Sequence, residues 1–441
     1  MSLKRLTDSS ISTGNKFGSA NMDYPYSLAF ISGYDDYSGT NPLTVTLQNG
    51  DIVIANAAGS YQWGTVSRIN VNTGTTLWSK IFSTRTPAGF ASIAKDSSDF
   101  VYLLAGDGSI YKINSSNGTI SWQSKESRVG SFIAVNGSYL YLVGQANDLG
   151  NTNYDMTLIV LNTSNGSQVS TRYLRHPSGN LTLYGGRFAA TSSYVFTHAS
   201  TASAVSGYGG SANQFMRTNS TGGSATGYLV GSTTLTSQGN AIASDSSNNI
   251  YLGAYGSYKF MVTKIPDSMS SITFSKQYTV NSNTSLETRS IFHSNGFVYV
   301  TGRHDRGGYE HHFVAQINAT TGALVKAIYL DGYYTQNFYN ASIDSTNIYF
   351  GAEFWDGSGS GILDQFGFLV INQDLSKNIG NSLTFLGVTR TWVDATADFT
   401  TSDTGFSINT PGYTNNTFSS TTTTPTNSFI NNGSRYTRVV M

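Results

Sequence analysis

Short apolar runs alternate along the chain with clusters of Asp, Asn, Ser and Gly, and this alternation repeats. In the clearest copy, residues 91–122, an apolar strand is followed by a turn at Asp96 and a second strand centred on Tyr102. A third strand ends at Asn114, and a turn to Gly118 leads into a fourth strand that ends in Trp. Units of about 50 residues with four strands each are typical of β-propeller blades.

The strand centred on Tyr allows the copies to be counted. One unit has too little hydrophobic surface to fold alone, whereas several arranged radially bury their faces against one another. The sequence therefore predicts an all-β fold, a single seven-bladed β-propeller of four-stranded blades over residues 27–392. The seven copies of the strand are Ile52–Ile54, Val101–Leu103, Leu140–Leu142, Tyr194–Phe196, Ile250–Leu252, Val298–Val300 and Ile348–Phe350.

The two ends of the chain lie outside the repeat. Residues 1–26 are predicted to form an extended N-terminal arm, and residues 393–441 a polar, irregular C-terminal extension. Residues 421–425 are of low complexity, whereas residues 435–440 alternate like a strand. This last segment either pairs with an edge strand, in this chain or a neighbouring one, or forms a terminus without fixed structure. The seventh copy has a candidate last strand near residues 383–386, so the ring could close by simple docking.

Composition excludes several classes of function. Only 11% of the 441 residues are charged, 25 basic against 25 acidic, so a basic patch for nucleic acid is not expected. No run of 18 apolar residues is present, which predicts no membrane span. Without Cys there is no disulfide, thiolate metal site or Cys nucleophile. Residues 1–8 lack the apolar region of a signal peptide, so a location outside a cell would require another route, such as release of a virus particle by lysis.

The loops between the second and third strands vary most and are expected on one face of the disc, where propellers carry their function. The loop richest in charge lies within residues 302–312 and contains His304, Asp305, His311 and His312. Imidazole and carboxylate groups suit zinc, but His311 and His312 are adjacent and would point to opposite faces of an extended segment. Since no metal-ligand spacing is met, we predict a solvated loop with local ion pairs and no metal.

Aromatic and acidic residues gather in the same set of loops. We predict that Trp63, Tyr154, Tyr309, Trp355 and Asp356 form a binding surface for a sugar or a protein, because Tyr and Trp dominate interface energies. Two alternatives stay open: the aromatic side chains cover the bases of the loops, or paired carboxylates hydrolyse glycosides. The sequence contains no nucleophile elbow, phosphate loop or zinc-protease motif. We therefore expect a protein that is not an enzyme and has no cofactor.

Two stretches, Asn70–Trp78 and Asn114–Trp122, resemble the tryptophan-docking repeat of quinoprotein-like β-propellers. In both, Gly follows the Asn by four residues and Trp follows it by eight, and Asn318–Gly322 keeps the pattern without the Trp. The resemblance implies that each Trp locks one blade to the next. The quinone dehydrogenases of that family carry adjacent cysteines and a charged calcium site. Because this chain has no Cys, their cofactor is not expected here.

A second resemblance concerns overall character. The composition rich in Ser, Thr, Asn and Gly, the absence of Cys and the polar opening at residues 6–14 are similar to structural proteins of tailed bacteriophages, marine phages included. This implies a virion component, in a tail, fibre or head decoration, that contacts other virion proteins through its N-terminal arm and C-terminal tail. A carbohydrate-binding adhesin that engages host-surface glycans, located in the virion or outside the cell, is the alternative. A hydrolase or quinoprotein-like enzyme comes third, and assembly with copies of itself stays open.

Overall fold

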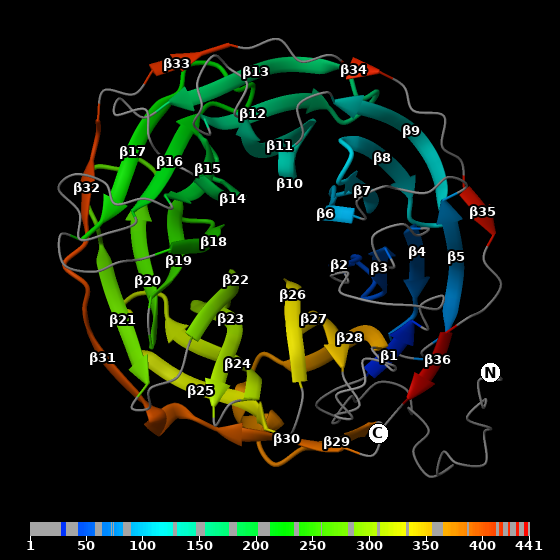
Figure 1. The fold of residues 1–441 in the computed structure, drawn as a ribbon, viewed down its shortest axis with the longest axis vertical. Coiled ribbons are helices and arrows are strands. Elements are labelled where there is room, and N and C mark those ends of the chain that lie inside the picture. Colours follow the sequence, from blue (N-terminus) through cyan, green and yellow to red (C-terminus); the bar gives the residue numbers. More distant parts are fainter. Residues whose placement is uncertain are drawn as a thin grey trace.

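Seven antiparallel sheets stand radially around a central axis, and Figure 1 shows them as the blades of a propeller. The predicted all-β, seven-bladed fold is confirmed. The computed structural model describes residues 28–31, 43–57, 64–71, 73, 75–82, 90–126, 130–146, 155–175, 183–201, 212–232, 238–256, 258–280, 286–306, 309–331, 335–354, 365–385, 388–411, 414–417, 422–423, 429–431 and 436–439.

The first six blades each use four consecutive strands, of which the first lies next to the axis (Figure 1). Blades one to three consist of β2 (Leu43–Thr46), β3 (Ile52–Ala57), β4 (Gly64–Ile69) and β5 (Thr76–Phe82); β6 (Phe90–Lys95), β7 (Phe100–Ala105), β8 (Ser109–Asn114) and β9 (Thr119–Glu126); and β10 (Gly130–Asn136), β11 (Tyr139–Ala146), β12 (Asp155–Asn162) and β13 (Gln168–Arg175). Blades four to six consist of β14 (Leu183–Ala190), β15 (Val195–Thr201), β16 (Asn213–Thr218) and β17 (Thr226–Gly231); β18 (Gln238–Ser244), β19 (Asn249–Gly256), β20 (Lys259–Pro266) and β21 (Phe274–Val280); and β22 (Leu286–Ser294), β23 (Phe297–Arg306), β24 (Tyr309–Asn318) and β25 (Leu324–Asp331).

The Asn and Gly of the repeat form the turn between the third and fourth strands. In the second blade, Asn114 Oδ1 accepts a hydrogen bond of 2.9 Å from the backbone N–H of Ser116, and the N–H of Gly118 donates to the Asn114 carbonyl at 2.8 Å. Gly118 has a φ of +70°, which glycine adopts without the steric cost of a side chain. The recurring pair therefore encodes a tight hairpin at the same place in several blades.

The ring closes through a strand from the N-terminal end. The seventh blade contains β26 (Thr335–Ile343), β27 (Asn347–Phe354) and β28 (Gln365–Asn372), and its fourth strand is β1 (Leu28–Ile31). β1 pairs antiparallel with β28, with Leu28 opposite Leu369. The expectation that residues 383–386 supply this strand is wrong, because β1 already occupies the edge of β28.

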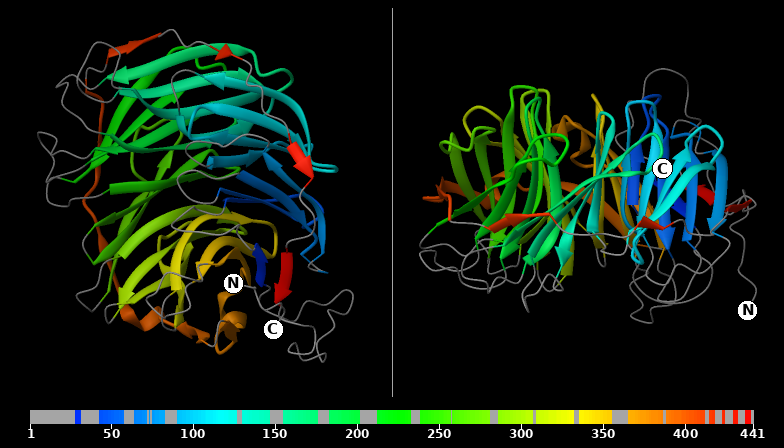
Figure 2. Two further views of the ribbon diagram at one scale, coloured as in Figure 1. Left: turned by 45° about the vertical axis from the view of Figure 1, so that its right-hand side comes forward. Right: turned by 90° about the horizontal axis from the view of Figure 1, so that it is seen from above.

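The C-terminal segment forms a belt around the rim of the ring. We use the name belt for β30 (Val388–Asp394), β31 (Phe399–Asp403), β32 (Ser407–Asn409), β33 (Thr414–Asn416), β34 (Thr422–Thr423), β35 (Phe429–Asn431) and β36 (Tyr436–Val439). In this order they pair with β25, β21, β17, β13, β9, β5 and β1. The belt therefore pairs with the sixth blade first, continues down to the first blade, and ends on the seventh. Figures 1 and 2 show these orange and red strands on the outside of the disc. β29 (Ser382–Phe385) pairs with β30 on the sixth blade.

The expectation of an irregular C-terminal extension is therefore wrong for its described parts, although the strand at its end was anticipated. The physical reason is that the fourth strand of each blade would otherwise present unpaired N–H and C=O groups at the rim. The strands of the belt form backbone hydrogen bonds with these groups. Side chains add to this pairing: Lys276 Nζ lies 2.7 Å from Asp403 Oδ1, and Thr422 Oγ1 donates to Glu126 Oε1 at 2.6 Å. The ring of Phe399 lies 5.6 Å from that of Phe260.

Hydrophobic side chains of neighbouring blades pack against each other, and the repeated Tyr lies at the centre of these contacts. Tyr102, Tyr141, Tyr251, Tyr299 and Tyr349 are all buried. Trp392, from the belt, packs into the cluster that joins the sixth and seventh blades. The helical elements among the described residues are two short 3₁₀ turns, η2 (Leu375–Asn378) and η3 (Thr396–Asp398). In the part of the chain that the structure describes, no helix has the length and apolarity to span a membrane.

Candidate functional site

The loops that were predicted to bind a partner follow the second strand of each blade. Trp63, Tyr154, Trp355 and Asp356 lie outside the described residues. Tyr309 is the first residue of β24 and pairs with Arg306 of β23, but its side chain is outside the described part of the structure. The predicted binding surface therefore stays a prediction, and the described residues define other features that could serve function.

The three histidines of residues 302–312 lie in a long hairpin. β23 and β24 pair over their whole length, with His304 opposite His311 and Arg303 opposite His312. All three histidine side chains are buried, and His311 Nδ1 lies 3.2 Å from the carbonyl oxygen of Leu330. The expectation of a solvated loop is wrong at these three residues, because the two strands continue their pairing almost to the tip. Among the described residues, no three His, Asp or Glu side chains come close enough to hold a metal ion.

Each tryptophan of the repeat docks one blade onto the next, as predicted. Trp78 Nε1 donates to the carbonyl oxygen of Ser115 in the second blade at 2.7 Å, and Trp122 Nε1 donates to Thr163 of the third blade at 2.9 Å. A Cβ atom on Gly118 would lie only 2.7 Å from the Trp78 ring, so the indole lies directly on this glycine. The turn glycine thus has two roles, a positive φ and space for the ring.

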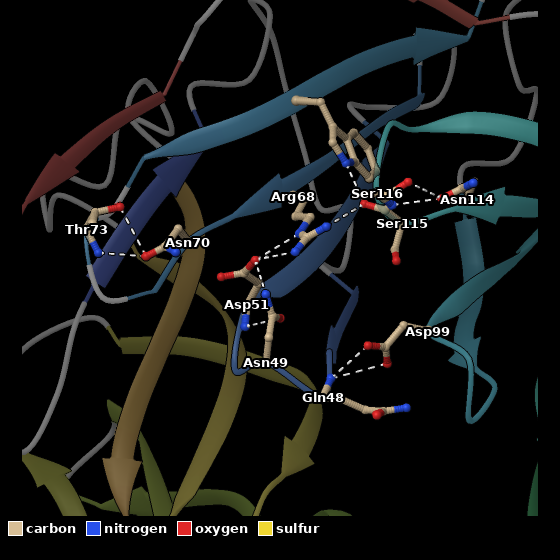
Figure 3. Close-up of polar contacts among 11 residues, drawn as sticks. Gln48, Asn49, Asp51, Arg68, Asn70, Thr73, Asp99, Asn114, Ser115 and Ser116 are labelled. Atoms are coloured by element: carbon tan, nitrogen blue, oxygen red, sulfur yellow. Dashed lines mark hydrogen bonds and ion pairs between the residues drawn. The ribbon is translucent and has the colours of Figure 1, made fainter. Parts of the chain in front are cut away.

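At these junctions between blades, an Arg or Lys side chain adds a second hydrogen bond to the next blade. The sequence analysis did not identify these cationic residues. Arg68 of β4 donates to Asp51 Oδ2 at 2.6 and 2.9 Å and to the Ser115 carbonyl oxygen at 3.1 Å, as Figure 3 shows. Asp51 is buried in a turn of the first blade, and the bond from Arg68 to Ser115 joins this blade to a turn of the second. Corresponding bonds to backbone carbonyls of the next blade run from Lys112 to Thr163 (2.9 Å), Arg172 to Gly222 (2.8 Å), Arg217 to Ser268 (2.8 Å) and Lys264 to Ala319 (3.0 Å).

The repeated Tyr caps the turn between the first and second strands. The hydroxyl of Tyr102 donates to Asp96 Oδ2 at 2.9 Å, and that of Tyr251 donates to Asp245 Oδ2 at 2.8 Å. Burial and the adjacent carboxylate of Asp96 raise the pKa of Tyr102 well above its ordinary value, so the phenol stays protonated and remains a donor. These bonds fix the Asp turns of the repeat and give the blades a shared polar framework on one face.

The axis of the ring contains a cavity of about 250 Å³ that all seven innermost strands line. Among its described lining residues, the ionisable side chains are Arg187 of β14 and Arg289 of β22. Hydroxyl-bearing residues and apolar side chains make up most of the remaining wall. The channel therefore combines two positive charges with neutral hydrogen-bonding groups at the centre of the molecule.

The radial sheets define the class of protein as a seven-bladed β-propeller, and the docked tryptophans of its first two blades are similar to those of quinoprotein-like repeats. A family model described as outer membrane protein assembly factor BamB matches residues 48–257, which agrees with this class. A search of curated protein sequences gave no match.

Three solved structures match this chain at low sequence identity. The polysaccharide lyase Uly1 is 10% identical, with 78% of this chain and 94% of that chain covered and a TM-score of 0.51. BamB from Moraxella catarrhalis is 14% identical, covering 74% of this chain and 81% of its own, with a TM-score of 0.39. The Cps50 (Swd1) propeller domain of Myceliophteria thermophila is 8% identical, covering 76% and 97%, with a TM-score of 0.45. The likeness to Uly1 supports a shared fold and leaves activity undecided.

The quinone cofactor and calcium ion of the quinoprotein-like dehydrogenases do not fit this channel. The chain has no Cys to place beside the cofactor. Among the described residues that line the cavity, the charged groups are arginines, and no carboxylate is present to bind a divalent cation.

Proposed function

We propose that this protein is a non-enzymatic assembly and binding scaffold and a structural component of a virus particle. The observation that carries the proposal is the belt, which adds an outer strand to every blade and meets the N-terminal strand on the seventh. A propeller opens where two blades separate. Here, opening the ring also requires strands of the belt to leave the rim, because the belt crosses from blade to blade around the ring.

The belt suits a protein that must persist outside a cell without disulfides. Such proteins depend on slow unfolding, since an opened molecule is degraded or aggregates before it refolds. The chain has no Cys for covalent stabilisation. Backbone pairing of β31 with β21 and polar contacts such as Lys276 with Asp403 hold the rim together instead.

The belt also changes which surfaces are open to partners. Exposed strand edges invite pairing with other chains, and short edge strands limit this. The outermost strands β31 to β36 are two to five residues long, so the rim offers little continuous edge. The described parts of the C-terminal tail are already paired within the chain, which leaves the N-terminal arm and the loop face as contact regions for other virion proteins.

A mass-spectrometric inventory of purified virus particles from the source of this gene tests the proposal. We expect the protein at a fixed copy number relative to the major capsid protein, retained after washing at high salt. Absence from washed particles would reject the virion role. In that case a glycan array with the folded protein distinguishes the adhesin alternative.

A further inference from the structure

One aromatic side chain in the described part of the structure is exposed to solvent. Tyr258 is 44% exposed, whereas the other Phe, Tyr and Trp side chains that the structure describes are buried or half-buried. Tyr258 lies in the link between β19 and β20, the second and third strands of the fifth blade. This link belongs to the set of loops that carries the predicted binding surface. An exposed Tyr in that position offers an aromatic plane to a partner.

The backbone of Tyr258 has a conformation that its side chain disfavours. Gly256 pairs with Lys259, so residues 257 and 258 alone join the two strands, and Tyr258 has a φ of +64°. In such two-residue hairpin turns Asn, Asp or Gly usually supplies the positive φ, because a bulky side chain is strained there. The carbonyl oxygen of Tyr258 accepts a hydrogen bond of 3.1 Å from the Val280 N–H, which fixes the turn against β21.

The other non-glycine residues with a positive φ have ordinary reasons for it. Among the described residues they are Asp99, Asn248, Met269 and Asn295. Asp and Asn tolerate this region, and the Met269 side chain is buried in the cluster between the fourth and fifth blades. Tyr258 belongs to neither group. A conformational cost that core packing does not require is typical of functional positions, so it points to a role for the exposed ring.

Neutral polar side chains form the surface next to this ring. Lys259 pairs with Thr279 of β21, and Thr279 pairs with Thr400 of the belt strand β31, so the three residues form a row across the outer part of the blade (Figure 1). Further along the same two strands, Gln277 Nε2 donates to Ser402 Oγ at 2.7 Å. Thr400 and Ser402 are exposed. The surface therefore combines one aromatic ring with hydroxyl and amide groups and a single cationic side chain.

We propose that Tyr258 and the neighbouring belt surface of the fifth blade bind one pyranose ring of a glycan. The C–H groups on one face of the sugar stack on the phenol ring, and its hydroxyl groups exchange hydrogen bonds with Thr279, Thr400 and Lys259. The Tyr ring has few rotatable bonds, so little entropy is lost when it is ordered. A protein partner would be expected to meet a larger apolar patch than one ring among polar groups.

This site rests on the binding role proposed above and names its ligand class, but it does not depend on a location in the virus particle. The two tests are therefore separate. A protein that is absent from particles could still bind the sugar, and a virion protein that ignores the sugar would leave the structural role standing.

Ligand-observed saturation-transfer NMR with the intact chain tests the site. The probes are the methyl glycosides of glucose, galactose, mannose and N-acetylglucosamine, and the open-chain polyol sorbitol, which has hydroxyl groups but no ring face. We expect saturable binding of at least one glycoside and no binding of sorbitol. Y258A weakens binding by about tenfold or more, whereas Y258F, which keeps the ring, stays close to wild type. L77A removes another exposed side chain, on the first blade, and leaves binding unchanged.

Guanidinium unfolding separates a binding role from a structural one. Y258G removes the ring and gives the turn a residue that favours a positive φ, so its unfolding midpoint is expected to equal or exceed that of wild type while binding is lost. M269G also relieves a positive φ but removes a buried side chain, so its midpoint falls.

The proposal is overturned if none of the glycosides binds the folded wild-type protein at millimolar concentration, or if sorbitol binds as well as they do. It is also overturned if Y258A and Y258G bind as tightly as wild type. A midpoint for Y258G as low as that of M269G would show that Tyr258 is a structural residue, and this too would contradict the proposal.

Discussion

Replacing Gly118 by alanine measures how closely the Trp78 ring is docked on the second blade. The glycine has a φ of +70°, and a Cβ atom built on it lies 2.7 Å from Trp78 Cε3 and 2.9 Å from Cδ2. The left-handed backbone costs an alanine about 1–2 kcal/mol. Pushing the ring out of a packed position costs about 1–3 kcal/mol more. G118A is therefore expected to lower the free energy of unfolding by about 2–5 kcal/mol.

Gly50 offers a matched control in the first blade. Its φ is +83°, and no atom lies within 4 Å of an added Cβ, so G50A incurs the backbone cost alone. Guanidinium unfolding with a shared m-value gives both differences. In a W78A background the added Cβ at Gly118 meets only Lys80 Cε, at 3.0 Å, which is the end of a flexible side chain, so the cost of G118A falls close to that of G50A. The docking model is refuted if G118A costs no more than G50A, or if its cost is the same with and without Trp78.

Two further predictions concern charged and titrating groups. R68A leaves Asp51 buried without its partner and is expected to destabilise the protein by about 3 kcal/mol. K326A breaks the more exposed pair with Asp394 and costs less than about 1 kcal/mol in the same denaturation assay; equal losses would contradict the assignment of Arg68 as a junction residue. The pKa of His198 is depressed to about 3 in the folded state, so its contribution is complete above the unfolded pKa of about 6.5 and is lost as pH falls towards 3. Stability measured from pH 6.5 to 4.5 should fall less steeply in H198Q than in wild type, by up to about 1.4 kcal/mol per pH unit, and identical slopes would show that His198 does not titrate in this way.

The blades could be predicted from the sequence because their signals are local. The alternation of apolar residues, the Asn–Gly turn and the Trp at a fixed spacing all lie within one unit of the repeat, and the docking of Trp78 and Trp122 followed from them. The cationic residues at the blade junctions also have a signal in the sequence, a fixed spacing before the Asn of the repeat, and this signal was overlooked. Arg68, Lys112 and Arg217 each stand two residues before the Asn that ends the third strand. In a strand with one polar face such residues look like ordinary solvent-facing positions.

The belt could not be predicted because its pairing is not local. Strands such as β34 are two residues long and polar, too short to show any periodicity. Their partners lie far away in sequence: Thr422 faces Glu126, and β36 meets β1 at the other end of the chain. The arginines that line the axial cavity were missed for a related reason. Arg187 and Arg289 are about a hundred residues apart, and only closure of the ring brings them to one cavity.

Hydrogen exchange of the intact protein and of a chain ending at Asp398 tests the role of the belt most directly. The shortened chain lacks β31 to β36 but keeps β30 on the sixth blade, so β25 is an internal control. We predict faster exchange in β21, β17, β13, β9, β5 and β1, unchanged protection in β25, and faster global unfolding. Unchanged exchange in all seven outer strands, with an unchanged unfolding rate, would show that the belt does not hold the ring together and would remove the basis of the proposed scaffold role.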